Sequence, residues 1–384
     1  MRLINLFTLL FLSSTLIMAS NALTDYVVND VETSVLAKTR LRYIGDGDTK
    51  WLFQSNLTTK THFPKIHSIL DVSPHIEFAH SANHLNETKS LTRLVESYLI
   101  IHSKIGDFSF GNRRLNFQQS QFITQSSFNL IQRSFGQVSF ISPNKAFQAY
   151  GIYSVTEPDQ TDINHYDLGS YFFVARLINQ KDFILNSYLY LIQDHSSTVF
   201  LSPTFTFEDN QTLNINVGYQ KQATLTNEDT VQDKLGIYYD IVYSKSPKKH
   251  LKWQFGTRFF SGGDASDQFL APFSSGHAWD GILNRFQSNV ISGFDDDFRS
   301  FWASYQTSFI KNQTVEISSY IFRNGSMLKD YGAELDLAVQ TQIIPNTMFW
   351  TYKIGQYISG VHSDQASTLM MWFDFAIHLN PPSK

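Results

Sequence analysis

The chain alternates apolar and polar side chains, segment after segment of about ten residues, from position 33 to position 379. In the final segment, Met371, Phe373 and Phe375 fall on one face of an extended chain and Asp374 falls on the other. Strand side chains alternate with period two, so each segment has an apolar and a polar face. Repeated along a whole chain, this pattern predicts an all-β fold: a transmembrane antiparallel β-barrel of the outer-membrane porin type.

About eighteen strands account for the pattern, an even number that brings both ends of a closed antiparallel barrel to the same side. The predicted strands are 33–44, 51–63, 66–80, 91–103, 106–116, 136–142, 147–157, 168–179, 183–193, 197–207, 211–220, 234–244, 250–260, 299–309, 313–323, 331–344, 346–359 and 368–379.

The connections between these strands alternate between short and long. Tight turns are predicted at 64–65, 104–105, 180–182, 208–210, 310–312 and 345, and long loops at 81–90, 117–135, 158–167, 221–233 and 261–298. Short periplasmic turns and long extracellular loops are typical of outer-membrane barrels. The alternative is a soluble β-sandwich, which would bury its apolar faces and would not separate short from long connections.

The N-terminus has the features of an export signal. An apolar run from Ile4 to Met18 follows Arg2 and leads to the small residues before and at Ala22. We interpret residues 1–22 as a cleaved signal peptide and residues 23–384 as a single barrel domain in the bacterial outer membrane. A membrane anchor is the alternative, but its apolar core is short of the ~20 residues that a spanning helix needs.

Composition narrows the functional classes. There is no cysteine, which excludes disulfides and thiolate-ligated metals. Aromatic residues make up 15% and charged residues 17% of the chain, a balance that suits a lipid-facing surface with aromatic girdles. The net charge of −4 argues against a nucleic-acid partner, which would favour a strongly basic domain.

The alternation also assigns charged residues to the barrel interior. A charge facing hydrocarbon costs about 2–4 kcal/mol at the bilayer midplane, so charges on polar faces are expected to point inward. The predicted pore-lining residues are Lys38, Arg40, Arg42, Glu96, Arg113, Arg114, Arg176, Lys252, Arg258, Glu334, Asp336 and Asp374. Two interpretations stay open: charges that pair with one another and brace the barrel, or a mixed-charge constriction with bases facing acids across the pore.

The loop 117–135 is a candidate constriction. It combines amides, which satisfy sugar hydroxyls, with aromatic rings, which stack on sugars. The constriction candidates are Gln118, Gln121, Phe122, Phe128 and Arg133. A glutamine-rich solvated connector is the alternative.

The sequence gives little support to a catalytic or metal site. No serine stands in a Gly-x-Ser-x-Gly frame, and His277 near Asp264 and Asp280 is interpreted as a loop-packing residue. The acidic run 295–297 lacks the alternating spacing of a calcium loop. We predict no enzyme activity, no metal and no cofactor.

Three stretches carry motifs beyond the alternation. Residues 111–136 begin Gly-Asn-Arg-Arg-Leu-Asn, residues 261–296 contain Ser-Gly-Gly-Asp, Phe-Leu-Ala-Pro, His-Ala-Trp-Asp-Gly and Gly-Phe-Asp-Asp, and residues 331–336 read Tyr-Gly-Ala-Glu-Leu-Asp. In this order the motifs resemble those of the alginate-export family of outer-membrane porins. Asn112, Asn129 and Gly136 depart from it, standing where the family has two arginines and an aspartate. An anionic polyuronate favours arginines, so the departures weigh against alginate itself.

We therefore expect a porin for passive diffusion or export of small hydrophilic or saccharide solutes, surrounded by outer-membrane lipid. A non-conducting barrel that acts as receptor, adhesin or structural protein is the alternative. The sequence leaves open a homo-oligomer and a periplasmic export partner.

Overall fold

The computed structural model describes residues 32–45, 49–62, 66–67, 71–83, 89–115, 133–156, 163–164, 170–193, 195–222, 235–263, 268–271, 282–283, 286, 294–310 and 312–379. The predicted signal peptide lies outside these residues. The strands are β1 (Glu32–Gly45), β2 (Thr49–His62), β3 (Ile66–His67), β4 (Asp71–Asn83), β5 (Lys89–Ser103), β6 (Gly106–Arg113), β7 (Ser134–Ile141), β8 (Phe147–Thr156), β9 (Ile163–Asn164), β10 (Ser170–Asn179), β11 (Phe183–Ile192), β12 (Ser196–Phe207), β13 (Gln211–Gln222), β14 (Gly236–Lys248), β15 (Leu251–Phe260), β16 (Phe298–Thr307), β17 (Gln313–Asn324), β18 (Asp330–Ile344), β19 (Met348–Ser359) and β20 (Thr368–Leu379).

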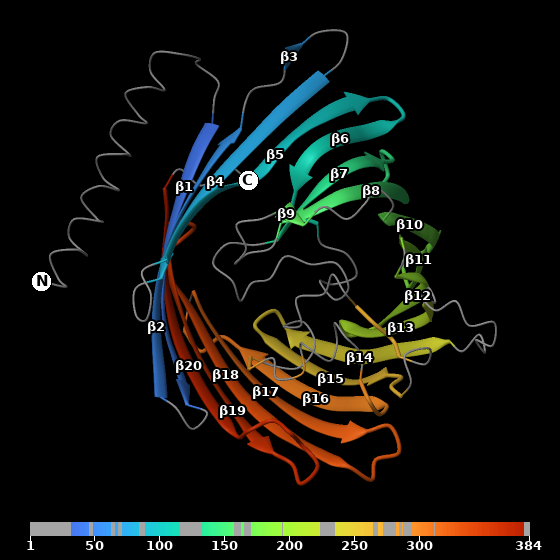
Figure 1. Ribbon diagram of the computed structural model, residues 1–384, viewed down its shortest axis with the longest axis vertical. Coiled ribbons are helices and arrows are strands. Elements are labelled where there is room, and N and C mark those ends of the chain that lie inside the picture. Colours follow the sequence, from blue (N-terminus) through green and yellow to red (C-terminus); the bar gives the residue numbers. More distant parts are fainter. Residues whose placement is uncertain are drawn as a thin grey trace, which may run out of the picture.

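The long strands form one closed antiparallel ring. β3 and β9 have two residues each, and β3 pairs only with β4 and β9 only with β8, so eighteen of the twenty described strands make up the ring. Each of these pairs with the next along the chain, and β1 pairs with β20 to close the ring (Figure 1). The closed, all-antiparallel sheet and the eighteen long strands confirm the predicted barrel.

The strand ends show the predicted asymmetry. At one end of the ring the connections include 104–105, 180–182, 208–210 and 249–250, and at the other end they include 114–133, 223–235 and 261–297. Asp209 and Asn210 have φ of 59° and 55°, the left-handed conformation that tight hairpin turns require and that these residue types tolerate. The loop-bearing end and the turn-bearing end are therefore distinct.

Most predicted strand boundaries differ from the observed ones by a few residues, and two of the differences have a clear physical reason. The segment 66–80 is not one strand, because β3 turns back on the start of β4, with Ile66 paired to Val72. Apolar residues continue through this turn and conceal it in the sequence. The predicted strand 106–116 ends at Arg113, because the next backbone N–H, that of Arg114, donates to the Glu96 side chain at 3.0 Å.

The two faces of the barrel wall differ as the alternation predicts. On β20, Phe373 is 42% exposed, whereas Trp372 and Asp374 on either side are buried, at 4% and 7%. The outer face carries exposed apolar side chains, including Leu335, Ile358 and Phe255. Many side chains on the inner face are buried, whereas Lys38 and Lys252 there are partly exposed. In the part of the chain that is described, no helix is long and apolar enough to cross a membrane.

An aromatic belt, which the composition alone did not locate, lines the inner face near the loop-bearing end. It consists of Phe172, Tyr190, Phe200, Tyr238, Phe260, Phe298, Phe322 and Tyr357, all buried. Neighbouring rings lie 5–6 Å apart, for example Tyr238 and Phe260 at 5.2 Å. Many of the aromatic residues attributed to lipid contact therefore pack inside the barrel.

Candidate functional site on the inner wall

A cluster of charges lies on the inner face where the barrel closes. Arg40 on β1 donates to Asp374 on β20 through Nε at 2.6 Å and Nη2 at 2.8 Å. The Lys38 ammonium lies 3.2 Å from the same carboxylate. The first and last strands are neighbours in a closed barrel, so these bases pair with this acid instead of facing it across the pore. For Asp374 the predicted transverse arrangement is wrong, and the pairing interpretation holds.

Trp372, two residues from Asp374, lies under three cations. The guanidinium carbons of Arg40 and Arg42 lie 5.1 and 5.9 Å from its ring centroid, and the Lys353 ammonium lies 4.7 Å away. An indole face attracts cations through its quadrupole, which favours holding these charges close together despite their repulsion. We call Lys38, Arg40, Arg42, Lys353, Trp372 and Asp374 the seam cluster.

The long loop, residues 261–297 between β15 and β16, is anchored to the wall by two predicted pore acids. The Ile282 N–H donates to Asp336 at 2.8 Å, and the Leu283 N–H donates to Glu334 at 2.9 Å. Both acids lie on β18 and are buried, at 4% and 2% exposure. Charge-assisted hydrogen bonds of this kind are stronger than neutral ones. The acids therefore hold backbone of the loop, a role that the alternation did not suggest.

A glycine makes room for this anchor. An added Cβ on Gly355 of β19 would lie 2.6 Å from both the Asp336 carboxylate and the Leu283 side chain. Only glycine leaves this space open without a shift of the loop or the acid.

A second anchor holds the start of the long loop. The Gln220 side chain on β13 accepts from the Leu270 N–H at 2.7 Å and donates to the Leu270 carbonyl at 2.9 Å. The Gln222 amide donates to the Gln268 carbonyl at 2.7 Å. Both side-chain amides form hydrogen bonds with backbone groups of the loop, as the backbone of a neighbouring strand would. They therefore fix the position of the loop beside the wall.

Aromatic residues of the long loop pack into the aromatic belt between these anchors. The Phe269 ring lies 5.8 Å from Phe200 and 5.4 Å from Tyr238. The Phe286 ring lies 4.9 Å from both Phe298 and Phe322. Full burial of a phenylalanine contributes about 1.5–3 kcal/mol, so these contacts hold the loop strongly to the inner wall.

Further round the wall, Arg258 and Asp240 form a buried pair. The Arg258 Nε lies 3.3 Å from the Asp240 carboxylate, which also accepts from the Asn216 amide at 3.3 Å. Lys252 lies on the same face of β15 and is partly exposed, and Arg176 on β10 is exposed.

The remaining predicted residues lie around β5 and β6. Glu96 is buried and holds the backbone of Arg114, and the Arg113 guanidinium lies 4.8 Å from the Tyr98 ring centroid. Arg133 is buried, at 8% exposure. The other constriction candidates, Gln118, Gln121, Phe122 and Phe128, lie outside the described residues. Along the inner wall the structure describes parts of the loop 261–297, namely residues 268–271, 282–283 and 286.

Several site residues were missed from the sequence. Lys353 and Asp240 each stand between apolar residues of a predicted strand, so the alternation could have found both. Trp372 carries no such signal, because its ring is apolar and only its cation neighbours reveal its role. Within the described ranges, no group of three or more His, Asp or Glu side chains is arranged to hold a metal ion.

Comparison with known proteins bears on the fold. No protein-family model matches the chain, and no curated protein does. The outer membrane protein OpdK of Pseudomonas aeruginosa is similar over 92% of this chain and 99% of its own, with a TM-score of 0.71 and 10% sequence identity. The structure of OpdK with vanillate matches over 92% of this chain and 99% of its own, with a TM-score of 0.69 and 10% sequence identity. OccAB2 of Acinetobacter baumannii matches over 92% of this chain and 98% of its own, with a TM-score of 0.69 and 9% identity. This chain thus has the closed antiparallel barrel fold of these outer-membrane proteins.

Proposed function

We propose that the protein is a channel of the bacterial outer membrane for small hydrophilic solutes. The observation that carries the proposal is the closed eighteen-stranded wall with exposed apolar side chains outside and charged side chains inside. At this strand number a barrel is wide enough to hold an aqueous channel. The near-complete coverage of solved outer-membrane proteins supports the same class.

The seam cluster favours solutes that carry a carboxylate. Four basic side chains surround one indole ring and one acid on the same stretch of wall. Lys38 and Lys353 are the partly exposed cations of the cluster, and their ammonium groups supply positive charge that a solute carboxylate can approach. OpdK has been determined with vanillate, an aromatic carboxylate, which makes vanillate a suitable first probe for this chain.

The resemblance to the alginate-export family supplies a second solute class. Uronate sugars carry both hydroxyls and a carboxylate, and partly exposed amides of the inner wall, such as Asn186 and Asn214, suit hydroxyls. The residues Asn112 and Gly136 depart from the family's charged positions. We therefore propose short uronates and other small saccharides ahead of the polymer, with passage by diffusion and no bond-breaking step.

Reconstitution of the refolded protein in a planar bilayer tests the proposal. We expect discrete current steps, a reversal potential that reports preference for anions in a KCl gradient, and block by vanillate or a uronate stronger than block by glucose. A folded barrel with no current steps would overturn the channel and favour the receptor, adhesin or structural alternative. Current steps with block by neutral sugar alone would retain the channel and reject the carboxylate solutes.

A further inference from the structure

Two arginines lie directly opposite each other on the outer face of the barrel near the loop-bearing end. Arg299 on β16 pairs in register with Arg323 on β17, one residue from the end of each strand. Side chains in this relation have Cβ atoms about 5 Å apart, and like charges so placed repel. Phe301 and Ile321, two residues further along each strand on the same face, are apolar, so the pair stands at the edge of the apolar band.

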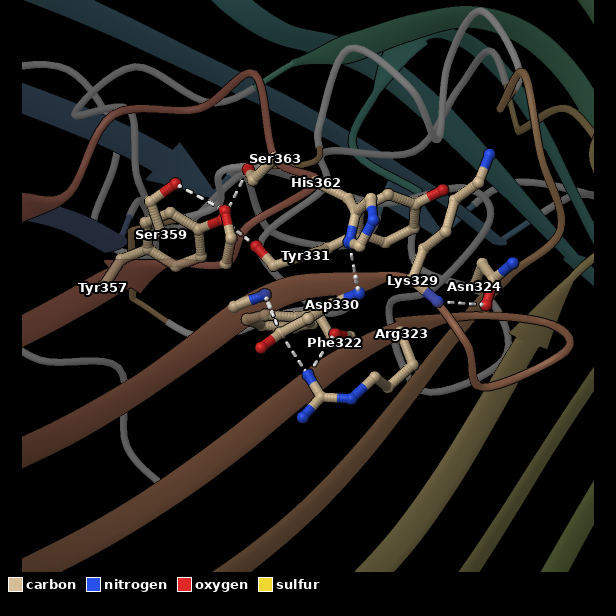
Figure 2. A network of polar contacts seen from close by, with 12 residues as sticks. Phe322, Arg323, Asn324, Lys329, Asp330, Tyr331, Tyr357, Ser359, His362 and Ser363 are labelled. Atoms are coloured by element: carbon tan, nitrogen blue, oxygen red, sulfur yellow. Dashed lines mark hydrogen bonds and ion pairs between the residues drawn. The ribbon is translucent and has the colours of Figure 1, made fainter.

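Among the described residues, only one of the two arginines has a carboxylate partner. Figure 2 shows the Arg323 guanidinium reaching Asp330 and the Phe322 carbonyl, and both contacts use Nη1. No described carboxylate lies within ion-pair distance of Arg299, and its buried Nε has no hydrogen-bond partner there. Two acidic residues that precede β16 interact with other groups. Asp297 accepts a hydrogen bond from the Gly262 N–H at 3.0 Å, and Asp296 forms an ion pair with Lys329.

Aromatic rings hold the unpaired guanidinium in place. Tyr239 and Phe259 stack with centroids 5.1 Å apart and an interplanar angle of 11°. The Arg299 guanidinium carbon lies 5.9 Å from the Tyr239 centroid and 5.5 Å from the Phe259 centroid. These two rings orient a planar, weakly hydrated donor at the edge of the apolar band, where outer-membrane barrels carry their aromatic girdles.

We propose that Arg299 and Arg323 bind a phosphate group of a lipid in the outer leaflet. A phosphate dianion would offset the repulsion between the two guanidinium groups and would accept charge-assisted hydrogen bonds from their terminal nitrogens. The outward position, beside an apolar band, selects a phosphate carried on acyl chains over one free in solution. This inference rests on the proposed function, because it requires the barrel to stand in that membrane.

Vesicles of phosphatidylcholine that contain bisphosphorylated lipid A provide the test. Wild-type protein and Arg299→Gln are reconstituted, extracted in mild detergent and examined by native mass spectrometry for retained lipid A. Loss of one charge-assisted contact predicts roughly tenfold weaker retention in the variant. Lys181→Gln removes a cation from an exposed turn at the opposite end and is the matched control, with retention expected to equal wild type.

Two further measurements separate the outcomes. Dephosphorylated lipid A should bind wild type and Arg299→Gln equally. Equal retention of phosphorylated lipid A by wild type and Arg299→Gln would overturn the inference, as would full displacement by millimolar inorganic phosphate, which would indicate a site for free anion. Membrane fractionation of cells tests the location separately, so a failure of the proposed function is distinguishable from a failure of the lipid site.

Discussion

Arg40 on β1 and Asp374 on β20 form a two-pronged ion pair, with contacts of 2.6 and 2.8 Å, although 334 residues separate them in the chain. The pair bridges the two strands that close the barrel, whose register places these residues opposite each other. Arg40 is 1% exposed, so the pair is shielded from bulk water. The closure of the ring therefore carries a specific polar contact in addition to its backbone hydrogen bonds.

Removal of one member of this pair should destabilise the barrel more than removal of both. In Arg40→Met, Lys38 is the one ion-pair partner that Asp374 keeps among the described residues, and breaking a buried pair costs about 3–5 kcal/mol. The double variant Arg40→Met/Asp374→Met avoids the unpaired acid and should recover much of that loss. Urea unfolding in detergent micelles, followed by tryptophan fluorescence, measures both. A loss in the double variant equal to the sum of the losses in Arg40→Met and Asp374→Met would show that the pair is not coupled.

Loss of the acidic anchors should release the long loop. Glu334→Ala/Asp336→Ala removes the acceptors for two loop N–H groups, each worth about 1.5–3 kcal/mol when the acceptor is charged. We expect faster protease cleavage within 261–297 and larger fluctuations of the open current. Glu334→Gln/Asp336→Asn keeps an acceptor oxygen at each position and is the matched control, with a smaller effect. Unchanged cleavage in the alanine variant would mean that the aromatic contacts alone hold the loop.

A side chain at Gly355 should displace the same loop from a folded barrel. The Cβ of Gly355→Val would lie 2.6 Å from the Asp336 carboxylate and the Leu283 side chain, and overpacking of this kind costs about 1–3 kcal/mol. We expect a change in single-channel conductance with little change in heat-modifiable gel mobility. Gly151→Ala is the control, because its added Cβ would meet nothing closer than 3.8 Å. Wild-type conductance in Gly355→Val would contradict the close approach of the loop.

Neutralising the seam cluster should reduce anion preference. Lys38→Gln/Lys353→Gln removes two cations beside Trp372 and Asp374 and leaves the Arg40 pair in place, so the chloride-to-potassium permeability ratio should fall about twofold or more. Reversal potentials in a KCl gradient measure this ratio. Lys181→Gln/Lys248→Gln removes the same charge from exposed positions at the turn-bearing end and should have a smaller effect. An equal effect of both variants would mean that overall charge, and not the inner wall, sets the preference.

Strand alternation predicted much of the wall because it depends only on local geometry. A strand that separates lipid from an interior must alternate, so Arg40, Arg258 and Asp374 were assigned to the inner face from parity alone. The same rule missed the split between β3 and β4, because apolar residues continue along the chain there and the sequence shows no break. Only the pairing of Ile66 with Val72 reveals it.

The roles of the inner residues could not be predicted in the same way. Glu334 and Asp336 were expected to line the pore, but what they hold depends on where the backbone of Ile282 and Leu283 lies, some fifty residues away in the chain. The transverse field predicted for Asp374 failed because closure of the barrel makes the first and last strands neighbours, which the assignment of Asp374 to the far side of the pore did not take into account. Phe269 and Phe286 have no periodicity in their loop, so their place in the aromatic belt carried no sequence signal.

The sequence by itself determined the architecture: the number of long strands, the two faces of the wall and the two unlike ends, because each follows from period-two alternation and connection length. Only the tertiary structure decided which charges pair, which loop packs against the inner wall and which cations gather at Trp372. These depend on contacts between residues distant in the chain, which form only when β1 meets β20 and the long loop meets β13 and β18.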